Sequence, residues 1–197
     1  AIRRALTEEE GDILAFLPGV AEIERAADRL AGINARIHRL HGSLDPAEQR
    51  AAIRKGPERK LILATSIAET SLTIDGVRIV VDSGLARRAR HDRSAGVTRL
   101  VTERVSQAAA TQRAGRAARQ GPGVAYRLWE ESATTGLIPF DPPEILEADL
   151  SSLLLDSALW GVRDPSALPW LDPPPKAAVA EARKRLTALG ALDEDER

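Results

Sequence analysis

The sequence predicts an α/β protein with an open parallel sheet, followed by a small, mostly helical segment. Over residues 1–82, strand-like apolar runs alternate with helical patterns, which is the order expected of parallel strands joined by right-handed crossovers. The composition changes after Trp129, where polar and proline-containing sequence replaces this alternation. We therefore expect two domains, at residues 1–130 and 131–197.

The predicted strands are mostly apolar or β-branched runs bounded by loop residues. Four of them stand at residues 12–17, 35–40, 60–64 and 77–82, and a further strand is expected at residues 124–128. Long apolar runs are typical of strands that are buried on both faces of a parallel sheet. Since ligands bind such sheets beyond the carboxyl ends of the strands, the segments after residues 17 and 64 are candidate binding loops.

Helix signals stand between these strands. A helical apolar pattern covers residues 20–31, and a second helix is expected to run from Asp45 to about Lys55. Asp45 is the expected N-cap of that helix, with a proline next to it and a glutamate three residues after the cap. Residues 1–11 are charged and lack apolar periodicity, so we expect them to form a loose lead-in.

Residues 85–102 predict a β-hairpin, because two strand-like segments, 85–90 and 97–102, flank a turn-rich sequence. The hairpin carries five arginines that suit contact with phosphates. They are Arg87, Arg88, Arg90, Arg93 and Arg99. The alternative is a soluble edge hairpin whose charges prevent pairing with other strands.

The next helix carries the residues on which the functional argument rests. Ser106 is its expected N-cap, and the glycines and proline at 121–123 end it. Gln112, Arg116 and Arg119 fall at i, i+4 and i+7, so an amide and two guanidinium groups line one face among small residues. Guanidinium groups bind phosphate oxygens through paired hydrogen bonds. This face is therefore a candidate phosphate site, and a solvated charged face is the alternative.

The C-terminal third of the chain predicts a linker and two helices. Residues 130–143 are polar and contain proline, which is typical of a linker. A strongly apolar helix is expected at residues 144–160, with Gly161 where a left-handed cap would fit. A last helix is expected at residues 177–189.

The composition is that of a globular protein and excludes several classes. Hydrophobic residues make up 43% of the chain, and no apolar run approaches the ~20 residues of a membrane span. Because there is no cysteine, disulfides and thiolate metal sites are excluded, and a reducing cytoplasm is the expected location. Three scattered histidines have no metal-ligand spacing, so no metal site is expected. The absence of methionine, even at position 1, suggests a fragment of a longer protein.

The net charge of −1 hides an uneven distribution of charge along the chain. Residues 36–120 carry 17 Lys and Arg against 8 Asp and Glu, whereas residues 130–197 carry 6 against 14. A basic middle favours contact with phosphates or nucleic acid, and an acidic tail is mostly a solvated surface.

Two long motifs give the chain a family resemblance. Residues 112–119 read Gln-Arg-Ala-Gly-Arg-Ala-Ala-Arg, which resembles motif VI of the DEAH-box helicases of superfamily 2, except that Ala118 replaces a glycine. Residues 64–76 read Ala-Thr-Ser-Ile-Ala-Glu-Thr-Ser-Leu-Thr-Ile-Asp-Gly, which resembles motif V, except that Ser66 replaces an asparagine. The resemblance runs from about Gly11 to the end of the chain and is closest to the bacterial HrpB-type helicases. It implies a RecA-like second motor domain with an inserted hairpin, followed by part of a winged helix.

The resemblance also implies roles at the nucleotide. Gln112, Arg116 and Arg119 match the motif VI residues that reach the γ-phosphate of ATP, where an arginine finger stabilises the transferring phosphoryl group. Asp75 matches the motif V carboxylate that contacts the ribose, and a helix or turn cap is its alternative role. Arg113 points elsewhere on the predicted helix, so a structural salt bridge is expected for it.

Three further residues match positions that contact the nucleic-acid backbone. Thr65 and Ser71 belong to motif V, and short hydroxyl groups at strand ends are common phosphate ligands. Gly19 resembles the motif IV position where the chain passes close to a phosphate. Loop capping and a turn glycine are the respective alternatives. In several family members an aromatic residue shortly after the position of Arg50 stacks on the base. Alanines and isoleucine at residues 51–53 replace it here, so base stacking from this domain is not expected.

The sequence contains neither a phosphate-binding Gly-x-x-x-x-Gly-Lys-[Ser/Thr] loop nor an Asp-Glu-x-His motif for magnesium. The resemblance implies that both belong to a preceding RecA-like domain, which would hold most of the ATP and Mg²⁺ and be the partner of this one. Single-stranded nucleic acid, RNA rather than DNA, is the other expected partner, and no membrane is. The expected function is the second motor domain of an ATP-dependent helicase, inactive by itself. The alternative is a non-catalytic nucleic-acid-binding or scaffold protein.

Overall fold

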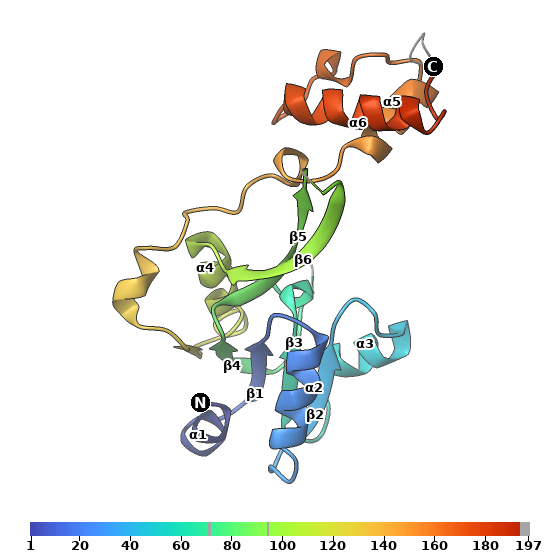
Figure 1. Cartoon of the computed structure of the whole chain (residues 1–197). Coiled ribbons are helices and arrows are strands. Elements are labelled where there is room, and N and C mark those ends of the chain that lie inside the picture. Colours follow the sequence, from blue (N-terminus) through green and yellow to red (C-terminus); the bar gives the residue numbers. More distant parts are fainter. Residues whose placement is uncertain (71, 94, 194–197) are drawn as a thin grey trace. The chain divides into compact units, whose positions relative to one another are not determined.

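The computed structural model describes residues 1–70, 72–93 and 95–193 (Figure 1). The chain forms two compact units. The first comprises Ala1–Arg88 and Thr102–Asp141, and the second comprises Ala89–Val101 and Pro142–Arg197. The domain boundary predicted after residue 130 stays a prediction. In the described ranges, no helix is long and apolar enough to cross a membrane.

A five-stranded parallel sheet forms the centre of the first unit, in the order β2-β3-β1-β4-β7. Its strands are β1 (Asp12–Phe16), β2 (Arg36–Leu40), β3 (Lys60–Ala64), β4 (Val77–Asp82) and β7 (Val124–Arg127). β1 and β3 are buried along their whole length, as their apolar runs predict. All five predicted strands are confirmed, with ends that differ by one residue at most.

Helices cover one face of this sheet. Successive side chains of a strand point to opposite faces, so alternate residues of the strands contact these helices. α1 (Ile2–Glu8) and α2 (Val20–Arg29) lie over this face, where Ile23 of α2 packs among side chains such as Ile13 of β1. The expectation of a loose lead-in at residues 1–11 is wrong. Ala5 is fully buried against this face, with Ile2 and Leu6 beside it, so three apolar side chains are enough to dock a short charged helix.

The other face is covered by α3 (Pro46–Ile53) and by the segment that follows β3. The predicted cap of α3 is confirmed, because Asp45 Oδ1 accepts hydrogen bonds from the amides of Ala47 at 2.8 Å and Glu48 at 2.9 Å.

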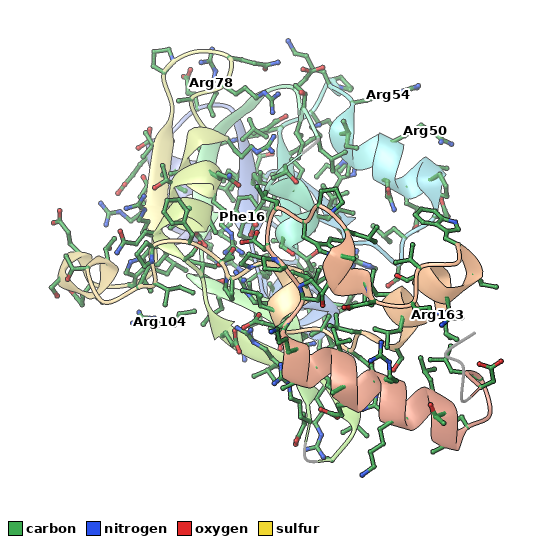
Figure 2. All side chains as sticks on the ribbon, turned by 90° about the horizontal axis from the view of Figure 1, so that it is seen from above. Phe16, Arg50, Arg54, Arg78, Arg104 and Arg163 are labelled. Atoms are coloured by element: carbon green, nitrogen blue, oxygen red, sulfur yellow. The ribbon has the colours of Figure 1, made fainter. Side chains whose placement is uncertain are left out.

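The end of α3 is tied to the sheet by a buried lysine at the start of β3. Lys60 Nζ donates to the carbonyls of Ala52 at 3.1 Å and Arg54 at 2.7 Å, and it lies 3.8 Å from a carboxylate oxygen of Asp12. Burial lowers the pKa of Lys60, and the charge of Asp12 opposes this effect. Arg54 itself projects from the end of α3 (Figure 2).

β5 (Leu85–Asp92) and β6 (Val97–Arg104) pair in a separate two-stranded sheet, which confirms the predicted hairpin. Within the described residues, three of its five arginines form ion pairs. Arg87 contacts Glu22 at 3.4 Å, Arg88 contacts Asp141 at 2.6 Å, and Arg90 contacts Glu147. These pairs reduce the positive charge that the hairpin offers to phosphates.

In the second unit, α5 (Ser151–Leu159) packs on α6 (Lys176–Ala188) through leucines and small residues. The predicted helix at 144–160 is interrupted. Glu144–Leu146 forms a short 3₁₀ turn, and the α-helix begins only at Ser151, whose amide and hydroxyl donate to Asp149 Oδ1 at 2.8 and 2.7 Å. By accepting these hydrogen bonds, the Asp149 side chain competes with the backbone hydrogen bonds of a continuous helix. Further 3₁₀ turns are Ser66–Ala68 and Glu131–Thr134 in the first unit and Pro165–Ala167 in the second. Gly161 has φ +81°, as the predicted cap requires.

We expect Asp149 to stabilise the second unit in a pH-dependent way. Burial opposes ionisation of this carboxyl, but hydrogen bonds from Ser151 and the charges of Arg185 and His91 outweigh burial, so the pKa of Asp149 lies below its usual value. The stability it contributes is therefore complete above the unfolded pKa of about 3.9 and is lost as the pH falls through the folded pKa. In urea unfolding followed by tryptophan fluorescence, Asp149→Asn should cost most at pH 7 and progressively less below pH ~4.

Asp156→Asn is the matched control, because Asp156 is an exposed carboxylate on α5. It should show no comparable loss at pH 7. A cost of Asp149→Asn that stays the same at every pH would contradict the role of its charge.

Candidate functional site

The segment that follows β3 runs from the carboxyl ends of the parallel strands back to their amino ends. β3 and β4 run parallel on either side of β1, so the chain must return from the carboxyl end of β3 to the amino end of β4. Residues 65–70 and 72–76 make this return across the face that α3 covers, with Ala68, Leu72 and Ile74 packed against the core. Thr65 therefore lies at the carboxyl ends of the strands, the carboxyl edge of the sheet, and Asp75 lies at their amino ends, the amino edge.

Arg113 anchors α4 (Gln107–Gly115) to this segment and to the sheet. Its side chain is 0% exposed. Nε donates to Glu69 Oε1 at 2.7 Å, and Nη1 donates to Asp82 Oδ1 at 2.8 Å and to the carbonyl of Leu85 at 3.1 Å. The guanidinium carbon lies 4.8 Å from the centre of the Phe16 ring. The prediction of a structural salt bridge at Arg113 is confirmed.

The predicted line of three residues on one α-helix is wrong, because α4 ends at Gly115. Beyond it the chain tightens, and the amides of Arg116, Ala117 and Ala118 each donate to the carbonyl three residues earlier, at 3.1 to 3.3 Å. Glycine is a poor helix former, which favours an end at this position. The cap at Ser106 is confirmed by its hydrogen bond from the amide of Ala109.

The Arg116 side chain turns toward the segment that carries Asp75. Its Nε donates to the carbonyl of Glu69 at 2.9 Å, and Nη1 donates to the carbonyl of Leu72 at 2.5 Å. Burial lowers the pKa of Arg116, and the nearby positive charge of Arg119 lowers it further. Gln112 and Arg119 are both exposed. An anion at this place would relieve the repulsion between the two guanidinium groups.

Gln120 connects the end of this tight turn to Asp75. Its Nε2 donates to Asp75 Oδ1 at 2.7 Å, and its Oε1 accepts from the amide of Gly76 at 3.2 Å. Gly76 has φ +88°, a conformation that glycine adopts readily. Asp75 is exposed, so its carboxylate is accessible from solvent.

Two predicted residues follow adjacent strands at the carboxyl edge. Gly19 comes after β1 and Thr65 after β3, and the amide of Leu17 donates to the carbonyl of Ala64 at 2.8 Å. A Cβ at Gly19 would lie 2.6 Å from Nη1 of Arg87, so the ion pair of Arg87 fills the space that a side chain would need. Ser71, the third predicted nucleic-acid residue, lies outside the described residues.

The structure thus brings the predicted residues together in two groups. The first group comprises Arg116, which contacts the return segment, Arg119 close to it, and Asp75, which Gln120 joins to the same turn. Gln112 is an exposed residue of α4, and Gly19 and Thr65 form the second group at the carboxyl edge. Sequence reasoning assigned no role to Glu69, Asp82 and Gln120, which hold the first group in place. The only signal was that Glu69 stands inside motif V and Gln120 directly follows motif VI.

The first group suits an anionic ligand and not a metal ion. Two guanidinium groups repel each other there, and a carboxylate able to accept from hydroxyl groups stands nearby. Within the described part of the chain, no three Asp, Glu or His side chains cluster so that they could hold a metal. The residues therefore fit the phosphate and ribose of a nucleotide, while Mg²⁺ would need ligands from elsewhere.

Comparison with known proteins identifies the family of this chain. Residues 1–121 match the family described as the helicase conserved C-terminal domain. The chain is 46% identical over 198 residues to the ATP-dependent RNA helicase HrpB of Escherichia coli, covering 98% of this chain and 24% of that protein. It is 44% identical over 196 residues to a mouse protein called probable ATP-dependent RNA helicase DHX34, covering 96% of this chain and 17% of that protein.

A solved structure gives the same answer. The crystal structure of the Escherichia coli DEAH/RHA helicase HrpB matches all of this chain and 26% of its own chain, with a TM-score of 0.93 at 46% identity. The chain therefore belongs to the conserved C-terminal domain family of the DEAH-box helicases of superfamily 2. The predicted α/β fold with its parallel sheet and the resemblance to HrpB-type proteins are confirmed. The chain spans about a quarter of the HrpB protein that it matches.

We expect Arg113→Met to destabilise the first unit by about 3–5 kcal/mol, because it leaves the buried carboxylate of Asp82 and the partly buried carboxylate of Glu69 without their partner. Urea unfolding measures this cost. Arg119→Met is the control, since it removes the same group from an exposed position and should change the unfolding free energy by less than about 0.5 kcal/mol. Equal effects of the two substitutions would show that the buried ion pairs do not hold the site together.

Proposed function

We propose that this chain is the second RecA-like motor domain of an ATP-dependent RNA helicase, followed by part of a winged helix. In this proposal a preceding RecA-like domain of a longer cytoplasmic protein holds most of the ATP and Mg²⁺. The observation that carries the proposal is the pair Arg116 and Arg119 at a turn that Gln120 joins to Asp75, in a chain that belongs to the DEAH-box family. RNA helicase is also the description given to the HrpB and DHX34 relatives.

At the nucleotide, Arg116 and Arg119 act as arginine fingers and Gln112 assists them. Negative charge on the γ-phosphoryl oxygens must be stabilised as the group transfers, and guanidinium groups already placed there do so without reorganisation. Arg116 now rests on the carbonyls of Glu69 and Leu72, which are neutral acceptors that a phosphate can replace. Asp75 accepts a hydrogen bond from the ribose.

At the carboxyl edge, Gly19 and Thr65 contact the backbone of single-stranded RNA, and Ser71, which belongs to motif V, supplies a further contact. Contacts to phosphates position the strand and carry no sequence information, which suits an enzyme that moves along any sequence. The return segment 65–76 joins this edge to the edge of Asp75, so closure on ATP and release after hydrolysis can change the grip on the strand.

We expect Arg116→Ala and Arg119→Ala each to lower RNA-stimulated ATP hydrolysis by ~10³-fold or more in the longer protein that contains the phosphate-binding domain. Steady-state phosphate release with single-stranded RNA measures this. Arg54→Ala is the matched control, because Arg54 is an exposed arginine at the end of α3 and should leave turnover unchanged. The present chain alone should not hydrolyse ATP, and adding the preceding domain should restore turnover.

Hydrolysis at the normal rate in both arginine variants would overturn the finger roles. A longer protein that is folded but never hydrolyses ATP would favour a non-catalytic RNA-binding or scaffold protein.

We expect Thr65→Val to weaken RNA binding by roughly tenfold or more, equally for all sequences, because it removes one hydrogen bond of about 1.5–3 kcal/mol to a charged phosphate. Fluorescence anisotropy with labelled oligouridylate and oligoadenylate measures both effects. Thr7→Val is the control, since the Thr7 hydroxyl bonds only the carbonyl of Arg3 in α1 within the described structure. A loss confined to one oligonucleotide sequence, or no loss at all, would contradict the proposed contact.

A further inference from the structure

A hollow of about 540 Å³ lies between α1, α2 and the carboxyl ends of β1, β4 and β7 in the first unit. It opens on the face of the sheet that α1 and α2 cover, whereas Arg116 and Asp75 belong to the other face. None of the residues proposed to contact nucleotide or RNA lines it in the described structure. Its volume falls within the range of about 300–1,000 Å³ that is usual for ligand pockets.

The wall of this hollow is aliphatic. Leu17 follows β1, Leu128 follows β7, and Ile2 and Ala26 face them from α1 and α2. Leu128 is 52% exposed, and the other three are partly buried. An apolar side chain placed here would remove this surface from water, which stabilises a complex by about 25 cal/mol per Å² of apolar area before the costs of association.

The rim of the hollow is basic. Arg3, Arg25 and Arg29 line it, and the lining within the described residues includes one carboxylate, Glu22. Glu22 is already shared, because Arg25 contacts it at 2.7 Å and Arg87 at 3.4 Å. Arg3 Nη2 donates to the carbonyl of Arg29 at 2.8 Å, which brings its guanidinium to the end of α2. Positive charge therefore exceeds negative charge around an apolar wall.

We propose that this hollow is a docking site for a short acidic peptide segment of a partner protein. A large apolar side chain of the segment fills the aliphatic wall, and flanking carboxylates pair with Arg3, Arg25 and Arg29. The ion pair between Arg25 and Glu22 at the surface contributes little to the free energy of folding. A ligand carboxylate can therefore replace Glu22 as the partner of Arg25 with little loss of stability. RNA fits less well, because Phe16, the aromatic residue in the lining, is only 1% exposed and packs in the core of the other sheet face, so it offers no ring face on which a base could stack. This site is independent of the proposed motor function.

Fluorescence anisotropy tests the proposal with a labelled octapeptide of alternating leucine and glutamate. We expect saturable binding to this chain that weakens at least tenfold in the double variant Arg25→Glu with Arg29→Glu. Leu128→Ser, which removes apolar surface without changing charge, should weaken binding severalfold. The control is Arg50→Glu with Arg54→Glu, an equal change of charge on α3 over the other face of the sheet, which should leave binding intact (Figure 2).

Three results would overturn the proposal. Equal binding of a matched leucine and lysine peptide would show non-specific apolar adhesion. Displacement of the acidic peptide by oligouridylate would make the hollow part of an RNA site. Loss of binding in the longer protein that carries the preceding domain would show that another part of the same polypeptide covers the hollow. Thermal unfolding followed by circular dichroism confirms that each variant is folded, and Leu128→Ser remains informative if the charge reversals are not.

Discussion

The buried guanidinium of Arg113 is the constraint on which the rest of the site depends. A fully buried charge is tolerated only when it is paired and hydrogen-bonded. Arg113 meets this requirement with Glu69 from the return segment, Asp82 from the end of β4 and the carbonyl of Leu85 at the base of the hairpin. One side chain thus fixes the position of α4 relative to three other parts of the first unit.

Glu69 carries this constraint to Arg116. Its carboxylate pairs with Arg113, while its backbone carbonyl accepts from Arg116. In the proposed motor, a phosphate that draws Arg116 away frees the carbonyls of Glu69 and Leu72 but leaves the anchor at Arg113 intact. The same segment begins at Thr65 beside the proposed RNA edge and ends at Asp75 beside the proposed ribose. A local event at the nucleotide therefore has a short covalent path to the nucleic acid.

Much of the fold could be predicted because its signals are local. Apolar runs marked β1, β3 and β4 of the sheet, and Asp45 and Ser106 marked two helix starts. One error came from a tertiary effect and another from a local hydrogen bond that periodicity does not show. α1 forms because Ala5 and its neighbours have a sheet face to dock on, and the side chain of Asp149 interrupts the helix expected at residues 144–160. Pairing of Arg113 with Glu69, 44 residues away, cannot be predicted from spacing along the chain. The roles given to Gln112, Arg116, Arg119, Asp75, Gly19, Thr65 and Ser71 stay predictions.

In the proposed arrangement, Arg113 anchors α4 while Arg116 and Arg119 act as arginine fingers. Its most direct test is a crystal structure of the longer protein with ADP, a metal fluoride that mimics the transferring phosphoryl group, and single-stranded RNA. The arrangement predicts that Arg116 and Arg119 lie within hydrogen-bonding distance of the fluoride group, while Arg113 still contacts Asp82 and Glu69. A structure in which the mimic is bound but Arg116 keeps its contacts with the carbonyls of Glu69 and Leu72 would contradict it.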